Sequence, residues 1–213
     1  MSPRNSVLPL AFVLLLASAG LGADPDVITI TKAQPVIERK TFDPANKPKD
    51  MPALTGNEAA VAVNDFSVNS EAEFTQAAGA MQAKVEAVSM KLALRVTIWN
   101  PKGASAALKE HEEGHRRISE HFYTDAEVVA RDLAKEYIGR TIDLNDPSPE
   151  SLQRATNAIV NEIGRTYLQR TQTRAQQAND AYDRITDHGR NRKVTVDDAI
   201  KQVLAHGTGM SGM

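Results

Sequence analysis

The chain has 213 residues, of which 41% are hydrophobic and 24% are charged, and its formal net charge is −2. This length suffices for one domain with a sizeable core plus tails, and the proportions are ordinary for a globular protein. A nearly balanced charge without a basic stripe argues against nucleic acid as a partner.

The first residues predict a secretory signal peptide. Arg4 supplies a short basic region, residues 7–16 form an apolar run, and Ala19 or Ala23 offers the cleavage site. The run is too short to span a bilayer comfortably, so we expect cleavage and no stable membrane insertion. The chain has no cysteine, which excludes a lipobox anchor and disulfides. An exported, cysteine-free chain is typical of a bacterial periplasmic or secreted protein.

The N-terminal half shows β patterns. Short β-branched runs within residues 26–39 predict two strands, residues 59–68 predict another, and residues 41–56 predict a loop or linker. Residues 83–99 alternate between apolar and polar, with a slip in phase near Ser89 that indicates two strands or one bulged strand.

Two long helices are predicted in the C-terminal half. The first begins at about Ser105 and ends before Gly139, and the second begins after Ser148 and ends near Gly189. The second is polar all round at residues 169–177, where we expect a kink or weak packing. The first helix has an apolar or functional face at three- and four-residue spacing, which includes Leu108, His111, Glu112, His115, Ile118, Phe122, Ala126, Val129 and Leu133.

A metal-binding pattern, H-E-x-x-H, lies on this face at residues 111–115. Residues four apart on a helix point the same way, so His111 and His115 can bind one metal ion. Glu112 can take a proton from a water on that metal. Zinc suits the pattern because two imidazoles, a third protein ligand and a water complete a tetrahedral shell. The alternative is an accidental match on a solvated helical turn, which predicts no metal.

The third ligand stays open on spacing alone. His121 stands where H-E-x-x-H-x-x-G-x-x-H places a third histidine, but Ile118 replaces the glycine, and an unbroken helix turns His121 away from His115. His188 lies far along the second helix, and straight antiparallel helices would leave it roughly 20 Å out of step with His115. A carboxylate could also serve, but spacing does not select among Glu136, Glu162, Asp180 and Asp183.

Two segments, L-K-E-H-E-E-G-H at residues 108–115 and A-Y-D-R-I-T-D-H-G at residues 181–189, together resemble a known family. It is a bacterial family of predicted secreted zinc-dependent proteases, catalogued as domain of unknown function number nine hundred twenty-two. The resemblance covers roughly residues 59–189. It implies that His188 is the third ligand, with Asp183 or Tyr182 close to the metal or its water.

These observations predict an α+β, zincin-like fold, with a small antiparallel sheet in the N-terminal half followed by two long helices. The predicted parts are a signal peptide (1–23), an extended N-terminal segment or linker (24–56), a zincin-like metal-binding domain (57–192) and a short C-terminal element with a tail (193–213).

The predicted function is zinc-dependent hydrolysis of peptide bonds in the bacterial cell envelope. His111, His115 and His188 would bind Zn²⁺, Glu112 would act as the base, and Tyr182 or Asp183 would assist the metal or the transition state. The substrate would be a peptide or protein. The alternative is a non-catalytic envelope protein that binds metal, or serves as an adaptor, on the same helical scaffold.

Overall fold

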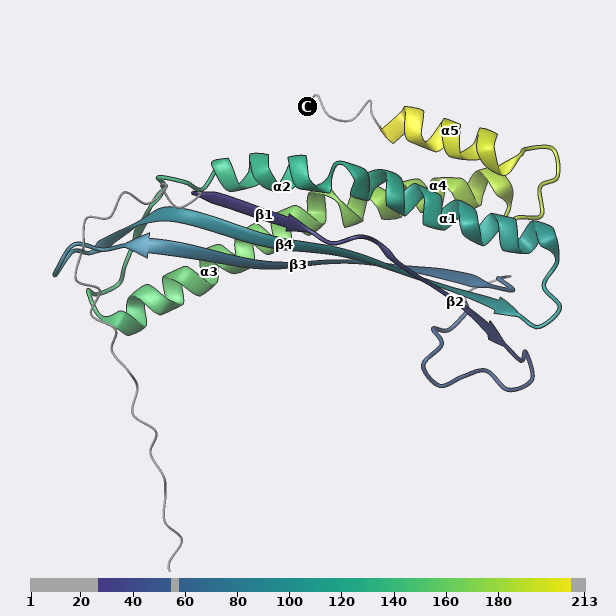
Figure 1. Ribbon diagram of the computed structural model, residues 1–213, viewed down its shortest axis with the longest axis horizontal. Coiled ribbons are helices and arrows are strands. Elements are labelled where there is room, and N and C mark those ends of the chain that lie inside the picture. The colour runs from purple at the N-terminus through teal and green to yellow at the C-terminus, as the bar shows by residue number, and fades with distance from the viewer. Residues whose placement is uncertain (1–26, 55–57, 208–213) are drawn as a thin grey trace, which may run out of the picture.

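A computed structural model describes residues 27–54 and 58–207. The predicted signal peptide and residues 208–213 of the predicted tail lie outside the described residues. The described part forms an elongated molecule in which helices lie along one sheet (Figure 1). Its elements are β1 (Ile28–Lys32), β2 (Val36–Phe42), β3 (Val61–Thr75), β4 (Gln82–Pro101), α1 (Ala106–Thr124), α2 (Ala126–Lys135), β5 (Thr141–Asp143), α3 (Pro149–Arg170), α4 (Gln172–Thr186) and α5 (Val196–Gly207).

The five strands form a mixed sheet with β4 at its centre. β1 and β2 pair with β4 in parallel, whereas β3 and β5 pair with it antiparallel. The prediction of a small antiparallel sheet is therefore wrong. The cause is topological: β2 and β3 meet the same end of β4 but flank it on opposite sides, with β2 opposite Pro101 and β3 opposite Trp99. Local alternation of apolar residues carries no information about which strand lies between two others.

The long strand β4 has one buried face. From Val88 to Ile98 the even-numbered side chains are buried, while Lys91 and Arg95 on the other face are exposed. The pairing with β3 shifts between Glu73 and Phe74, so that β4 has one extra residue there. β4 is thus one bulged strand, and its bulge lies at Glu86, N-terminal to the slip predicted near Ser89.

The helices cover the buried face of β4. The main core joins β4 to Tyr123 of α1, Leu133 of α2, and Ile163 and Tyr167 of α3. α5 packs on the outside of α1 and α4, where Ile118, Tyr182, Ala199, Ile200 and Val203 form a second cluster. Among the residues that the structure describes, no helix has the length and hydropathy needed to cross a membrane.

The prediction of two long helices is also wrong, because each of the two is divided. The first breaks at Asp125 between α1 and α2, and the second breaks at Thr171 between α3 and α4. The Thr171 hydroxyl donates to the Tyr167 carbonyl oxygen, a bond that bends helices. This break falls inside the polar stretch 169–177.

The connection between the helix pairs also removes the expected mismatch in length. After α2, the chain turns at Gly139 (φ 78°) and forms β5 against the start of β4. As a result α3 begins beyond the end of α2 and runs back along the sheet (Figure 1). α4 is thereby brought beside α1, with Asn179 in contact with His115.

Candidate metal centre

α1 carries the H-E-x-x-H residues into the interior. Ser105 caps the helix, since its hydroxyl accepts from the backbone N–H of Leu108. From this start, the face of α1 that meets α4 and β3 presents His111 and Glu112, each 3% exposed, and His115, which is 8% exposed. Two imidazoles and a carboxyl group are thus buried side by side.

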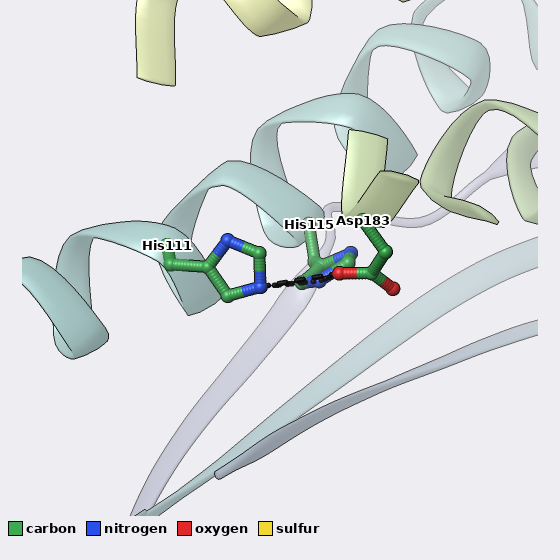
Figure 2. A group of neighbouring side chains, drawn as sticks. All are labelled: His111, His115 and Asp183. Atoms are coloured by element: carbon green, nitrogen blue, oxygen red, sulfur yellow. Dashed lines mark hydrogen bonds and ion pairs between the residues drawn. The ribbon is translucent and has the colours of Figure 1, made fainter. Parts of the chain in front are cut away.

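Asp183 of α4 completes a triangle with the two imidazoles (Figure 2). Its Oδ1 lies 3.2 Å from Nε2 of His111 and 3.1 Å from Nε2 of His115, and the two Nε2 atoms are 3.3 Å apart. Oδ1 is buried and has no hydrogen-bond partner of good geometry among the described residues. The three atoms therefore converge without a donor that satisfies them.

The other ring nitrogens assign the tautomers. Asn179 donates from its amide nitrogen to the Ala175 carbonyl oxygen, so its Oδ1 accepts from Nδ1–H of His115 at 2.8 Å. Thr186 donates its hydroxyl hydrogen to the Tyr182 carbonyl oxygen, so its oxygen accepts from Nδ1–H of His111 at 3.4 Å. Both histidines therefore direct the Nε2 lone pair toward Asp183.

Three lone pairs that meet in a buried space repel one another unless a cation lies among them. In a tetrahedral shell with Zn–N of 2.0–2.1 Å, neighbouring ligand atoms stand about 3.3–3.4 Å apart. The three sides of the triangle, 3.1–3.3 Å, fit that spacing closely. The donor set of two imidazoles and one carboxylate also suits zinc.

The electrostatics of the three side chains agree with this need for a cation. Burial lowers the pKa of His111. Burial also opposes the charged form of His115, but the hydrogen bond and charge of Asp183 outweigh it and raise the pKa of His115. For Asp183, desolvation is outweighed by the close polar contacts and charges of both histidines, which hold the pKa of its carboxyl below the ordinary value. The Asp183 carboxylate thus favours the positive charge on His115 alone.

Tyr182 supports the imidazoles from behind. Its ring stacks on His111 at 5.0 Å and meets His115 edge-on at the same distance. Its hydroxyl donates to the His111 carbonyl oxygen at 3.2 Å, and the side chain is completely buried. The ring can approach because residue 114 is glycine: a Cβ there would stand 2.2 Å from the Tyr182 hydroxyl. Tyr182 thus positions the histidines and does not face the cleft.

The end of α4 has an unusual backbone. Asp187 and His188 take positive φ angles of 47° and 50°, and Gly189 follows at 77°. A Cβ at Gly189 would lie 3.0 Å from Cβ and Cγ of His111, so this glycine both turns the chain and packs on the first histidine. The turn brings His188 to the rim of the site.

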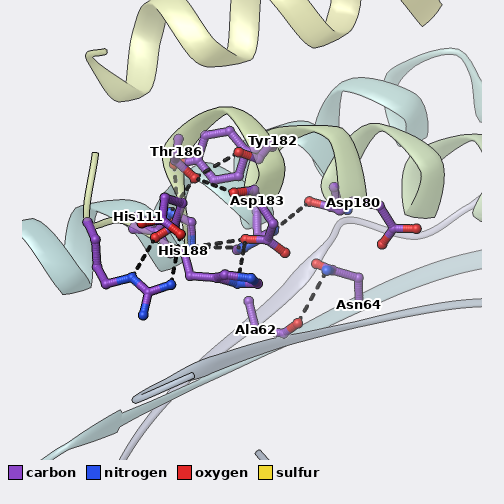
Figure 3. A network of polar contacts seen from close by, with 12 residues as sticks. Ala62, Asn64, His111, Asp180, Tyr182, Asp183, Thr186 and His188 are labelled. Atoms are coloured by element: carbon purple, nitrogen blue, oxygen red, sulfur yellow. Dashed lines mark hydrogen bonds and ion pairs between the residues drawn. The ribbon is translucent and has the colours of Figure 1, made fainter. Parts of the chain in front are cut away.

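His188 lies beside the triangle and not within it. Its Nδ1 is 3.6 Å from Oδ1 of Asp183, and its side chain is 39% exposed (Figure 3). The cluster that can hold a metal contains His111, His115 and Asp183. The structure thus brings Asp183 to the third corner of the triangle and places His188, the predicted third ligand, beside it.

Glu112 lies between α1 and the start of β3. Burial raises the pKa of its carboxyl to about 7, against smaller lowering contributions from His115 and from the backbone of Ala62. It lines a cleft of about 400 Å³. The floor of this cleft is formed by α1, one wall by residues 58–64 and the other wall by α4 with His188. In Figure 3, Ala62 and Asn64 of β3 face Asp183 and His188 across this space.

The other candidates lie apart from the triangle. His121 is exposed, because Ile118 stays buried and α1 continues to Thr124 without the turn that a third histidine would need. Glu136 forms an ion pair with Arg170. Glu162 accepts from Tyr137. Asp180 lines the cleft but accepts from Gln176 one turn away.

Asn179 is a site residue that the sequence analysis missed. It lies four residues before Asp183, so it occupies the same face of α4. A search for polar residues one helical turn before Asp183 and two turns before Thr186 would have selected it. Nothing in the sequence indicates, however, that this face of α4 meets His115.

Comparisons of the chain with protein-family models, curated proteins and solved structures found no match.

Proposed function

We propose that this protein is a zinc-dependent peptidase of the bacterial cell envelope. The observation that carries the proposal is the convergence of three lone pairs, from His111, His115 and Asp183, beside the buried carboxyl of Glu112 at the base of a cleft. The H-E-x-x-H pattern and the resemblance to secreted zinc-dependent proteases support the same reaction class. The signal peptide predicted from the sequence at residues 1–23 supports the location.

The proposed ligands are His111, His115 and Asp183. Asn179 and Thr186 hold the two imidazoles in the tautomers that a metal requires. A bound zinc ion would supply Lewis-acid polarisation of a carbonyl oxygen and a water of lowered pKa.

Glu112 is the proposed general base. Its carboxyl is buried beside the two histidines and lines the cleft, where it can accept a proton from the attacking water and pass it to the leaving amine. His188 lies just beyond the end of α4, where its partly exposed side chain lines the cleft. It would donate a hydrogen bond to the substrate carbonyl oxygen as negative charge develops there.

The test compares the zinc-loaded wild type with Glu112→Gln on a mixed peptide library, with products read by mass spectrometry. The wild type should cleave peptides, whereas Glu112→Gln should retain its zinc and lose turnover by a factor of at least about 100. Glu113→Gln is the matched control, because the Glu113 carboxylate binds Arg39 outside the cleft. It should keep activity within a few-fold.

Retained turnover in Glu112→Gln would remove Glu112 from the mechanism. Stoichiometric zinc without cleavage of any peptide would instead favour the non-catalytic metal-binding or adaptor protein.

A further inference from the structure

A second hollow lies along β3, away from the proposed metal centre. It is an open groove of about 780 Å³ between β3 and the helices α3 and α4. β3 contributes residues 68–70, and its other lining residues include Gly164 and Arg165 of α3 and Gln172 and Thr173 of α4.

The groove and the cleft are both lined by β3 and by α4, and they lie next to each other along these two elements. On β3 the cleft ends at Asn64 and the groove begins at Val68, and on α4 the groove reaches Thr173 while the cleft begins at Gln176. One helical turn therefore separates them on α4. Together they follow β3 from Ala62 to Ser70, a path of about 26 Å at ~3.3 Å per residue.

Beyond Ala62, the outer edge of β3 has no partner strand among the described residues. Within the described part of the chain, β3 forms a strand ladder only with β4. Ala62 directs its N–H to Glu112 and its carbonyl oxygen to the amide of Asn64, so both groups point away from β4. Because alternate residues of an antiparallel strand point the same way, Asn64, Phe66 and Val68 also direct N–H and C=O to this free edge.

The groove presents one charge that the protein leaves unpaired. Arg165 is exposed, and it makes no ion pair or hydrogen bond with any other described residue. The other polar groups of the groove are uncharged amides and hydroxyls from Asn69, Ser70, Asn161, Gln169, Gln172 and Thr173. A guanidinium among neutral groups favours an acidic side chain.

We propose that the groove binds a remote part of the same polypeptide substrate, in extended form, with an acidic residue against Arg165. This inference rests on the proposed peptidase function. Backbone pairing along β3 supplies binding that does not depend on sequence, and Arg165 supplies the preference for acidic residues. Substrates would therefore be unfolded or flexible segments, and short peptides that fill only the cleft would bind weakly.

The experiment uses two measurements on the zinc-loaded protein. One is kcat/KM for neutral peptides of about five and about ten residues, lengths that cover the cleft alone or the whole path. The long peptide is then made as a series in which a single Glu, Gln or Lys occupies each remote position in turn. The other is the Kd of the fluorescently labelled short and long peptides, measured by anisotropy with Glu112→Gln, which needs no turnover.

We expect the long peptide to bind at least about tenfold more tightly than the short one. Glu at one remote position should improve kcat/KM about fivefold over Gln, and Arg165→Glu should transfer that preference to Lys. The short peptide should not respond to Arg165→Glu. Lys201→Glu on α5 makes the same charge change on a helix that does not line the groove, and it should leave all these values unchanged.

Equal values for short and long peptides, or a Glu preference that survives Arg165→Glu, would overturn the inference while leaving the peptidase intact. If no peptide is cleaved, the peptidase function fails, and the Kd series still decides whether the groove binds acidic polypeptide.

Discussion

Gly114 of α1 and Tyr182 of α4 touch so closely that no side chain fits between them. A Cβ at residue 114 would stand 2.2 Å from the Tyr182 hydroxyl oxygen and 2.5 Å from Cζ. Gly114→Ala must therefore push Tyr182 off the two imidazoles. We expect it to lower the free energy of unfolding by about 1–3 kcal/mol, measured by urea denaturation with a chelator present.

Gly164 of α3 is the matched control for this substitution. A Cβ there would meet its nearest atoms at 3.7 Å and 3.8 Å, an ordinary contact. Since alanine is the better helix former, Gly164→Ala should raise the free energy of unfolding by up to about 1 kcal/mol. An equal rise in the free energy of unfolding for both variants would contradict the close contact between Gly114 and Tyr182.

Two buried tyrosines give a second pair of predictions. The Tyr123 hydroxyl lies 2.8 Å from the Ala33 carbonyl oxygen and 3.0 Å from that of Leu92, at the break between β1 and β2. The Tyr167 hydroxyl is buried with no hydrogen-bond partner among the described residues. Tyr123→Phe should therefore cost about 1–2 kcal/mol of stability, while Tyr167→Phe should cost nothing or stabilise. Thermal unfolding of the two variants checks the order, and a larger loss for Tyr167→Phe would contradict it.

Asn179 provides a test of the tautomer of His115. Asn179→Ala removes the acceptor for Nδ1–H, which should weaken zinc binding by about 10–100-fold. Asn179→Asp keeps an oxygen acceptor at that position, so it should bind zinc about tenfold more tightly than Asn179→Ala. Competition with a chromogenic chelator measures both affinities. Equal affinity of Asn179→Ala and the wild type would show that the amide does not orient the ligand.

Local sequence patterns predicted where α1 and α3 begin and which face of α1 is buried, but they could not predict the sheet. Ser105 and Ser148 cap helices because their side chains act on neighbouring N–H groups, an interaction that depends only on nearby residues. The parallel pairing of β1 and β2 with β4 depends instead on the strand order, in which β3 lies on the opposite side of β4. Nothing local to those strands encodes this order.

The site divides in the same way. His111, Glu112 and His115 form a local pattern, and their shared burial follows from the helical period. The placement of Asp183 in the triangle, with His188 beside it, depends on the break at Thr171 and on the left-handed turn at Asp187 and His188. Spacing alone could not decide whether Asp183 or His188 joins the two histidines, because a single straight helix would place both out of reach of His115.

The most direct test of the metal centre is the zinc content of the mature protein. Zinc per chain would be measured by mass spectrometry after dialysis, for the wild type, His115→Ala, Asp183→Ala and His188→Ala. We expect one zinc ion per chain in the wild type and in His188→Ala, and loss of zinc in His115→Ala and Asp183→Ala. Loss of zinc in His188→Ala with retention in Asp183→Ala would contradict the triangle, and a wild type that takes up no zinc would contradict the metal centre itself.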